Sequence, residues 1–261
     1  MKVFLLGQRG MLGHVVARYL AAQGHEVATS ELRYTGAAHD PLVEAARASG
    51  CEWIVNAAGV VPQRTPASGD MLLVNARLPV DLARRLGPGQ RLVHASSDCV
   101  FSGARGGYRV DDERDATDAY GLSKIQGEAA AAGGRCAVLR TSIIGPQAAG
   151  AHGLMAWFLA QRGTVDGYTN HRWNGVTTLQ WAKLCASLID GRLASAPIAQ
   201  AACAAALSKY ELLRLIAAAW PAQAGVRPAQ APQPVDRTLV PQIACPPIEE
   251  QLAELRAWYQ A

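Results

Sequence analysis

The sequence lacks the features that place a protein in a membrane, on a nucleic acid or outside the cell. Its six cysteines lie far apart, with no Cys-x-x-Cys pair, which favours reduced thiols over a disulfide framework or a zinc site. No stretch approaches the roughly twenty apolar residues of a membrane span, and the first residues do not resemble a signal peptide. The arginines form no runs. We therefore expect a cytoplasmic protein with no nucleic-acid or membrane partner.

The first 145 residues alternate between strand-like and helix-like segments. The strand-like apolar runs are 2–6, 26–29, 53–56, 91–95 and 137–140, and the stretches with helical periodicity are 11–23, 41–48, 70–86 and 118–132. This order is typical of right-handed crossovers and a parallel sheet. We predict an α/β fold for residues 1–145, with a Rossmann-type doubly wound parallel sheet and helices on both faces.

After residue 145 the alternation weakens. Helical patterns and capping signals at Thr177 and Ser208 predict further helices. These helices cover 154–162, 177–189, 208–220 and 248–259. The alanine runs are typical of helices, and the proline-rich residues 225–234 predict a loop. We expect residues 146–261 to form a smaller substrate-binding region that is interleaved with the first domain.

The first strand runs directly into a glycine-rich turn that opens the first helix. This context turns a glycine pattern into a dinucleotide-site hypothesis. Glycines permit a tight turn and a close approach of the backbone to a pyrophosphate, whose charge meets the helix N-terminus. The cofactor-binding residues predicted here are Gly7, Gln8, Arg9, Gly10, Met11, Leu12 and Gly13.

The end of the second strand bears on the choice between NADP and NAD, because an acidic side chain there binds the unphosphorylated ribose of NAD. Thr29 and Ser30 occupy the expected position, and Arg9 and Arg33 could bind a 2′-phosphate. This pattern favours NADPH. Glu31 keeps NADH open, since a shift of one or two residues would bring its carboxylate to the ribose.

Three residues have the chemistry of carbonyl reduction. Tyr120 and Lys124 are four residues apart, so on a helix they share one face, and a neighbouring positive charge lowers the pKa of a phenol. Ser97 follows the fourth strand, at the end where open α/β sheets bind ligands. Ser97 and Tyr120 would supply two donors to a carbonyl that gains negative charge as hydride arrives. We predict Ser97, Tyr120 and Lys124 as the catalytic residues.

With these motifs the chain resembles the extended short-chain dehydrogenase/reductase family, and within it the dTDP-4-dehydrorhamnose reductase type of nucleotide-sugar reductase. The resemblance extends in order over about the first 145 residues. The matching segments are Gly7 to Gly13, Asn56-Ala57-Ala58-Gly59, Ser96 to Gly103, Tyr120 to Lys124 continuing into Gln126-Gly127-Glu128, and Arg140-Thr141-Ser142.

The resemblance implies roles for single residues. Ser97 would take the hydroxyl role and Tyr120 would donate the proton, while Lys124 would lower the pKa of the tyrosine and bind the nicotinamide ribose. The further cofactor-binding residues are Asn56, Ala57, Ala58, Ala95 and Ser96. Asn75 would support the strand ends from its helix.

The chain also departs from that family. Ile143 stands where the rhamnose-forming enzymes usually carry a tryptophan, and no acidic cluster suits the magnesium that bridges some of their dimers. We predict no metal site, and a monomer or a homodimer. Residues 168–177 combine aromatic and hydrogen-bonding groups that suit a sugar diphosphate. The predicted substrate-binding residues are Ser97, Asp98, Val100, Tyr120, Ile143, His171, Arg172 and Trp173.

The sequence therefore predicts an NAD(P)-dependent oxidoreductase that reduces a nucleotide-activated 4-keto-6-deoxy sugar, in deoxysugar or surface polysaccharide biosynthesis. Two alternatives stay open. One is an epimerase or dehydratase of the same fold with tightly bound NAD. The other is a non-catalytic regulator that binds a dinucleotide.

Overall fold

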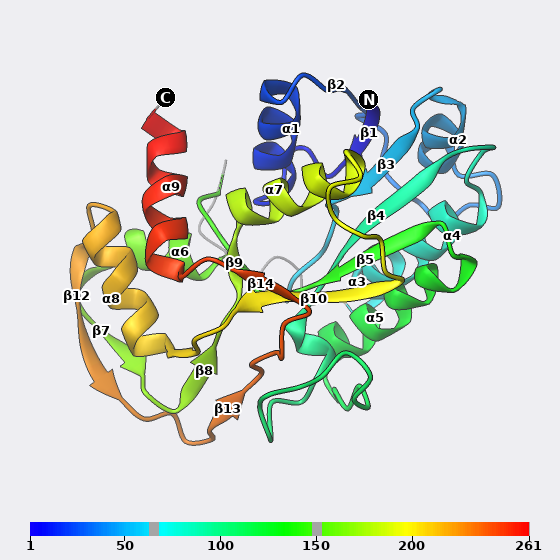
Figure 1. Ribbon diagram of the computed structural model, residues 1–261. Coiled ribbons are helices and arrows are strands. Elements are labelled where there is room, and N and C mark those ends of the chain that lie inside the picture. The colour runs from blue at the N-terminus through cyan, green and yellow to red at the C-terminus, as the bar shows by residue number, and fades with distance from the viewer. Residues whose placement is uncertain (63–67, 148–152, 261) are drawn as a thin grey trace.

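The core of the molecule is a seven-stranded sheet in which every paired neighbour is parallel. The computed structural model describes residues 1–62, 68–147 and 153–260 (Figure 1). The strand order is β14-β10-β5-β4-β3-β1-β2. The strands are β1 (Lys2–Leu6), β2 (Glu26–Thr29), β3 (Trp53–Asn56), β4 (Arg91–Ser96), β5 (Cys136–Arg140), β10 (Ile198–Cys203) and β14 (Ile243–Cys245). The predicted α/β fold is confirmed.

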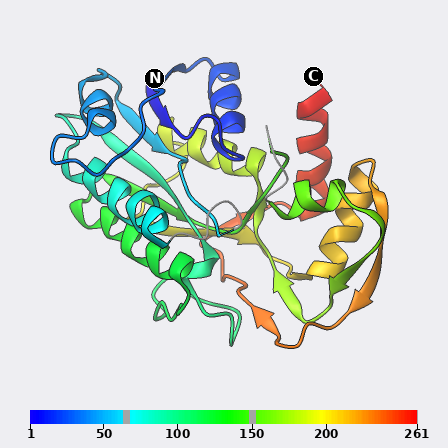
Figure 2. The same cartoon turned by 180° about the vertical axis from the view of Figure 1, so that it is seen from behind.

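Helices cover both faces of the sheet, as Figures 1 and 2 show. Val3 and Leu5 of β1 belong to a core with α1 (Gly13–Ala22) and α7 (Thr178–Ile189). Phe4 and Leu6 belong to a second core with α2 (Pro41–Ala48) and α4 (Leu78–Arg84). Because successive side chains point to opposite faces, a strand covered on both faces needs apolar residues throughout. This requirement explains the continuous apolar runs of the sequence.

Two strands of the sheet come from beyond residue 145. β10 lies between β5 and β14, and it contains part of an alanine run that suggested a helix. That expectation is wrong here, because pairing on both sides overrides the helix propensity of alanine. Ala201 and Ala202 are fully buried in this strand.

The remaining C-terminal elements form a small lobe around a core that includes Phe158, Leu212 and Leu252. The lobe contains α6 (Leu154–Leu159), β7 (Arg162–Tyr168), β8 (His171–Trp173), β11 (Leu207–Ser208), α8 (Lys209–Ala219), β12 (Gln223–Ala229), β13 (Val235–Asp236) and α9 (Ile248–Gln260). The loop predicted for 225–234 is wrong over 225–229, where β12 pairs with β7. Pro228 is tolerated because β12 is an edge strand.

The helix predicted for 70–86 is interrupted where it packs on α5 (Ala119–Gly127). A short α3 (Ser68–Met71) passes into the π-helix η1 (Leu72–Arg77) before α4 begins. Gly127 lies so close to the carbonyl of Asn75 that a Cβ atom would collide with it. π-turns often occur at functional sites, and this one carries Asn75.

Two 3-10 segments and two short strands complete the list of elements. α5 continues as the 3-10 helix η3 (Glu128–Gly133), and β4 is followed by the 3-10 turn η2 (Asp98–Val100). The two-residue strands β6 (Ile143–Ile144) and β9 (Val176–Thr177) pair in parallel between the sheet and the small lobe.

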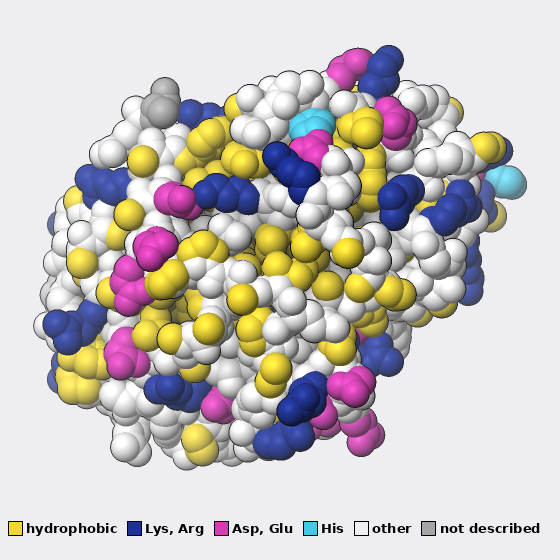
Figure 3. All heavy atoms as spheres, viewed as in Figure 1, with side chains coloured by type: hydrophobic (Ala, Val, Ile, Leu, Met, Phe, Trp, Pro, Cys, Tyr) yellow, Lys and Arg dark blue, Asp and Glu magenta, His cyan; other side chains and the backbone are white. Residues whose placement is uncertain are grey.

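The surface of the molecule mixes charges of both signs. In the view of Figure 3, Lys and Arg side chains alternate with Asp and Glu side chains around the rim, and hydrophobic side chains gather toward the middle of the face. Within the described ranges, no helix is long and apolar enough to cross a membrane.

Candidate active site

The glycine-rich turn after β1 forms a cradle that side chains would fill. Gly7 has φ +86°, and a Cβ atom on it would lie 2.6 Å from the amide of Ala58. A Cβ atom on Gly13 would collide with the carbonyl of Gly7. α1 begins at this turn without a side-chain cap, so no side chain of the turn takes the place of an anion at the helix N-terminus. The turn therefore fits a dinucleotide pyrophosphate.

Charged side chains meet at the end of β2 beside this turn. Glu31 forms an ion pair with Arg9 and accepts a hydrogen bond from Gln8 at 3.4 Å. Gln8 also donates to the carbonyl of Ser30 at 2.8 Å. Arg33 is exposed. The structure thus brings an acidic and a basic side chain together at the position that discriminates NAD from NADP.

The turn after β3 supports the cradle from the other side. Asn56 is fully buried, and its side chain accepts a hydrogen bond from the amide of Ala58 at 3.1 Å and contacts His94 Nδ1 at 3.2 Å. The side chain of Asn56 therefore shapes the turn from inside the protein. The backbone of Ala57 and Ala58 lies against Gly7.

Ser97, Tyr120 and Lys124 come together at the carboxyl end of β4. Tyr120 lies in the first turn of α5, where Asp118 accepts a hydrogen bond from the amide of Gly121 at 2.9 Å. The side chain of Ser97 lies beside the Tyr120 phenol and acts to lower its pKa. Lys124 is buried, and its Nζ donates to the carbonyl of Ala95 at 3.1 Å. A helix and a strand end thus place a phenol, a hydroxyl and an ammonium in one site.

Burial dominates the electrostatics of these residues. It raises the pKa of Tyr120 above its ordinary value, with Cys99 and Asp98 acting in the same direction, and it lowers the pKa of Lys124 to about 8. The shift in the pKa of Tyr120 has the opposite sign to the one predicted, because desolvation, Cys99 and Asp98 together outweigh the lowering effect of Ser97. Tyr120 therefore keeps its proton at neutral pH and can donate it.

Asn75 connects the π-turn to the catalytic helix. Its side chain donates to the carbonyl of Val60 at 2.8 Å and accepts a hydrogen bond from the Val60 amide at 2.8 Å. It also donates to Ser123 Oγ at 3.1 Å. Because Ser123 precedes Lys124, Asn75 fixes the catalytic helix against the segment that follows β3.

The profile of the RmlD substrate binding domain family matches residues 1–261. The chain belongs to this family. Comparison with curated proteins gives no match.

Solved structures with the same fold include several nucleotide-sugar enzymes. A dTDP-4-dehydrorhamnose reductase from Clostridium acetobutylicum is 19% identical, with a TM-score of 0.81 and 100% of each chain covered. The enzyme of the same name from Bacillus anthracis, in complex with NADP, is also 19% identical, with a TM-score of 0.81 and coverage of 100% and 99%. A UDP-glucose 4-epimerase from Thermotoga maritima, with UDP-glucose, is 13% identical, with a TM-score of 0.77 and coverage of 100% and 99%. The TM-scores show that these proteins share the fold of this chain, although their sequence identities are low.

In this RmlD family member, the predicted substrate residues do not all reach one site. Asp98 accepts a hydrogen bond from Ser97 Oγ at 3.0 Å, and Ile143 is half-buried in β6. Val100 and Trp173 are buried in apolar clusters, and their contact with substrate stays a prediction.

Two further predicted substrate residues bond to nearby loops. Arg172 is exposed and donates to the carbonyl of Ala206 at 2.9 Å. His171 contacts the carbonyl of Gln233 at 3.1 Å through Nε2. Both side chains therefore have partners within the small lobe.

The predicted cofactor residues Leu12 and Ser96 point into the protein rather than out of it. Leu12 lies in the core beneath α1, and Ser96 donates to Glu128 at 2.7 Å. Their contribution to a cofactor site would come from the backbone.

Two cations that the sequence pattern did not single out face the site from the C-terminal region. Arg237 donates to the carbonyl of Phe101 at 2.9 Å, and its Nη1 lies 3.8 Å from Cys99 Sγ. Lys209 opens α8, and its Nζ lies 5.5 Å from the centroid of the Trp173 ring. Burial lowers the pKa of Lys209, while nearby Asp98 and Cys99 oppose that shift. The capping box at Ser208 predicts where Lys209 lies on its helix, but no pattern singles out Arg237.

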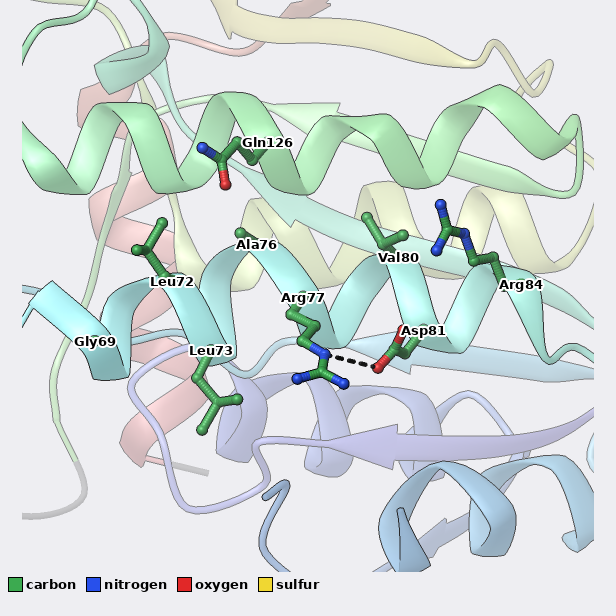
Figure 4. A pocket seen from close by; sticks show the side chains of 9 residues that line it. All are labelled: Gly69, Leu72, Leu73, Ala76, Arg77, Val80, Asp81, Arg84 and Gln126. Carbon is green, nitrogen blue, oxygen red and sulfur yellow. Dashed lines mark ion pairs between the residues drawn. The ribbon is translucent and has the colours of Figure 1, made fainter. Parts of the chain in front are cut away.

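Two cavities in the described part of the chain differ in their relation to these residues. One, of about 520 Å³, lies in the small lobe. It is lined by Leu154, Trp157, Val165, Asp166, Tyr168, His171, Lys209 and Leu213. The other, of about 610 Å³, lies over η1, α4 and α5, where Arg77 pairs with Asp81 at 3.5 Å (Figure 4). Only the first contains a residue, Lys209, that also faces Asp98 and Cys99.

Proposed function

We propose that this protein is an NADPH-preferring reductase of a nucleotide-activated 4-keto-6-deoxy sugar. The observation that carries the proposal is the meeting of Ser97, Tyr120 and Lys124 beside a glycine-lined cradle for a dinucleotide. Membership of the RmlD family supports it. So does the common fold with solved dTDP-4-dehydrorhamnose reductases, one of which is a complex with NADP.

The N-terminal half of the chain supplies the cofactor site. When bound, a reduced nicotinamide supplies the hydride that adds to the carbonyl carbon of the sugar. The N-terminus of α1 binds the pyrophosphate, because Gly7 and Gly13 leave room for it. Lys124 of α5, whose Nζ reaches the carbonyl of Ala95 near the end of β4, binds the nicotinamide ribose.

Tyr120 supplies the proton for the carbonyl oxygen. Its raised pKa keeps the phenol protonated at neutral pH. The hydroxyl of Ser97, which donates to Asp98 in this structure, turns to offer the carbonyl oxygen a second donor. As hydride adds to the carbon, the oxygen takes the phenolic proton. The tyrosinate that remains is stabilised by Lys124, which is charged below its pKa of about 8.

Arg237 and Lys209 bind the diphosphate of the substrate. A guanidinium and an ammonium suit phosphate oxygens, and both reach the vicinity of Asp98 and Cys99 from the C-terminal region. The 520 Å³ cavity beside Lys209 takes the nucleoside, since it offers the aromatic surfaces of Trp157, Tyr168 and His171.

The preference for NADPH depends on Arg9 and Arg33. Both side chains lie exposed around the end of β2 and could bind a 2′-phosphate. The ion pair between Arg9 and Glu31 makes NADH a second cofactor, because the carboxylate can accept a hydrogen bond from an unphosphorylated ribose.

The cellular setting that we propose is deoxysugar or surface polysaccharide biosynthesis in the cytoplasm. All six cysteines are free thiols, and five of them are buried. Such cysteines fit a reducing compartment.

An epimerase or dehydratase with tightly held NAD is the second candidate. It is favoured by the acidic Asp98 bonded to Ser97, since a dehydratase needs an acid next to this position. The fold shared with a UDP-glucose 4-epimerase also supports it. Protein purified with bound NAD and no net consumption of added NADPH would favour this candidate.

A ligand panel tests the proposal. NADPH and NADH are crossed with nucleotide sugars in thermal-shift measurements, because a ligand that binds the native state raises the melting temperature. Oxidation of NADPH is then followed with each 4-keto sugar that shifts the melting temperature. We expect a shift with NADPH, a further shift with the sugar, and turnover. The absence of a shift with every nucleotide would refute the proposal, whereas nucleotide binding without turnover would favour a regulator.

A further inference from the structure

A buried carboxylate joins the catalytic helix to the ends of two strands. Glu128, directly after α5, is fully buried. Arg140, the last residue of β5, donates to both of its carboxylate oxygens, from Nε at 2.8 Å and from Nη2 at 2.7 Å. Ser96, the last residue of β4, donates to the same carboxylate at 2.7 Å. Arg114, which is partly exposed, adds a contact at 3.1 Å.

The same guanidinium reaches the other half of the molecule. Arg140 Nη1 donates to Gln200 Oε1 at 2.9 Å and to the carbonyl of Val110 at 3.2 Å. Gln200, fully buried in β10, then donates to the carbonyls of Tyr108 and Val240 at 2.9 Å and 3.0 Å. The chain of hydrogen bonds therefore extends from α5 across β4, β5 and β10 to two loops.

Each end of this hydrogen-bond network lies next to a residue of the candidate site. Lys124 is four residues before Glu128 on the catalytic helix, and Ser97 follows Ser96. At the far end, the amide of Tyr108 donates to the carbonyl of Thr238 at 2.9 Å, directly after Arg237. Arg237 in turn donates to Phe101, whose ring lies under the Arg140 guanidinium at 5.1 Å. The network thus joins the proton-donating side of the site to the side that carries Arg237.

We infer that Glu128, Arg140 and Gln200 are positioning residues of the reductase, which hold the Ser97, Tyr120 and Lys124 set at a fixed place relative to Arg237. The inference rests on the proposed function. It also assigns a role to the segments Gln126-Gly127-Glu128 and Arg140-Thr141-Ser142, which do not themselves carry a catalytic group.

Stability alone is a weak reason to bury these charges. Removing two charges from water is expensive, and well-packed apolar residues of similar volume often stabilise a protein as well or better. A bidentate guanidinium, by contrast, fixes the relative place of the groups that it joins. Four separate segments meet at Arg140, so this side chain can fix the positions of those segments relative to one another.

Glu128 also acts on Lys124 through its charge. Lys124 faces Glu128 from its own helix, Cys99 from η2 and His94 from β4. Burial keeps His94 neutral by lowering its pKa to about 3. Glu128 and Cys99 raise the pKa of Lys124 against the larger effect of burial. Loss of the Glu128 charge therefore moves the deprotonation of Lys124 to lower pH.

The first test compares two buried glutamines. Gln200→Met removes the link to the loops without removing a charge. Gln90→Met is the matched control, because Gln90 is also buried and bonds to the backbone of Gly87, Ala46 and Cys51, remote from the catalytic residues. We expect Gln200→Met to lower kcat with the 4-keto sugar about tenfold and to raise KM, since small misplacements of reacting groups are costly. Gln90→Met should lower the melting temperature similarly and leave both constants within about twofold.

The second test separates charge from placement. Arg140→Lys keeps the charge and loses the bidentate geometry, and we expect it to lower kcat without moving the pH profile. Glu128→Gln keeps the shape and loses the charge, and we expect it to move the alkaline fall of kcat to lower pH. If Glu128→Gln fails to fold, the kinetic constants of Arg140→Lys and Gln200→Met still test the inference.

Equal effects of Gln200→Met and Gln90→Met on kcat, at equal loss of melting temperature, would overturn the inference. Affinity for NADPH distinguishes this failure from failure of the proposed function. If the wild-type protein binds NADPH but reduces no nucleotide sugar, the reductase assignment fails. The inference is then judged by the Kd of NADPH, which should rise in Glu128→Gln and Arg140→Lys but not in Gln90→Met.

Discussion

The two sides of the candidate site are built in different ways. The cofactor side comes from strand ends and two helices, α1 and α5, within residues 1–145, and each part lies in a short continuous motif. The proposed substrate side is assembled from Lys209 and Arg237, which are brought in by α8 and by the segment after β13. The comparison teaches that the proposed cofactor side follows from the geometry of the sheet, whereas the proposed substrate side depends on side chains from distant segments.

The largest expected effect is the loss of the proposed proton donor, Tyr120. Tyr120→Phe should lower kcat about a thousandfold, because general acid catalysis is lost, while the Kd of NADPH stays unchanged. Steady-state kinetics and calorimetric titration check the two values. Tyr19→Phe is the control, since Tyr19 packs on Trp258 at a distance from the site. If Tyr120→Phe retained its activity, Tyr120 would not be the proton donor, and the catalytic role given to this side of the site would be wrong.

The next effect concerns the cradle of the cofactor side. Gly13→Ala should weaken dinucleotide binding about 100-fold, because the added Cβ meets the backbone of Gly7 and a backbone shift of this kind costs a few kcal/mol. Gly69→Ala is a matched control, since Gly69 is also helical and has open space around it. Titration with NADPH measures both variants. Equal Kd values would show that the turn does not hold the cofactor.

A smaller effect is expected on the substrate side. Arg237→Gln should raise the KM for the nucleotide sugar about tenfold, because a charged hydrogen bond to the diphosphate is lost. The Kd of NADPH should not change. Arg192→Gln serves as the control, since Arg192 is exposed and pairs with Asp190 after α7, outside the cavity of the small lobe. If Arg237→Gln changed the affinity for NADPH and left the KM for the nucleotide sugar unchanged, Arg237 would belong to the cofactor side, and its assignment to the substrate side would be wrong.

The smallest effect concerns the choice of cofactor. Glu31→Gln should raise the affinity for NADPH relative to NADH about threefold, because it releases Arg9 and removes a negative charge near a 2′-phosphate. Glu26→Gln, at another exposed ion pair of β2, should leave the ratio unchanged. Parallel titrations with both dinucleotides give the ratio. A shift toward NADH would contradict the role given to Glu31.

The strands and helices that carry the proposed cofactor side could be predicted from the sequence because their signals are local. Gly7 to Gly13 follow a strand and open a helix, and Tyr120 and Lys124 lie one helical turn apart, so their spacing already implies their arrangement. The pKa of Tyr120 could not be predicted in this way. It depends on burial and on Asp98 and Cys99, and the depth of a side chain is a property of the folded molecule.

The substrate side could not be predicted because its signals are long-range. Arg237 is placed by the pairing of β13 with β8 and by the bridge between Leu239 and Tyr108. These partners are far apart in the sequence, so hydrophobic periodicity does not reveal their pairing. The same holds for the strands of that region. β10 is rich in alanine and β12 contains proline, so local propensity indicates a helix and a loop, and pairing with neighbouring strands overrides both.

The order of strands in the sheet has a consequence for how the chain reaches its native state. β14, near the C-terminus, pairs with β10, which in turn covers β5. During synthesis β5 is therefore an open edge until about sixty more residues have been added. The dinucleotide-binding strands can form early, but the edge at β5 is covered only when β10 has been made, and the final edge on that side is the three-residue strand β14.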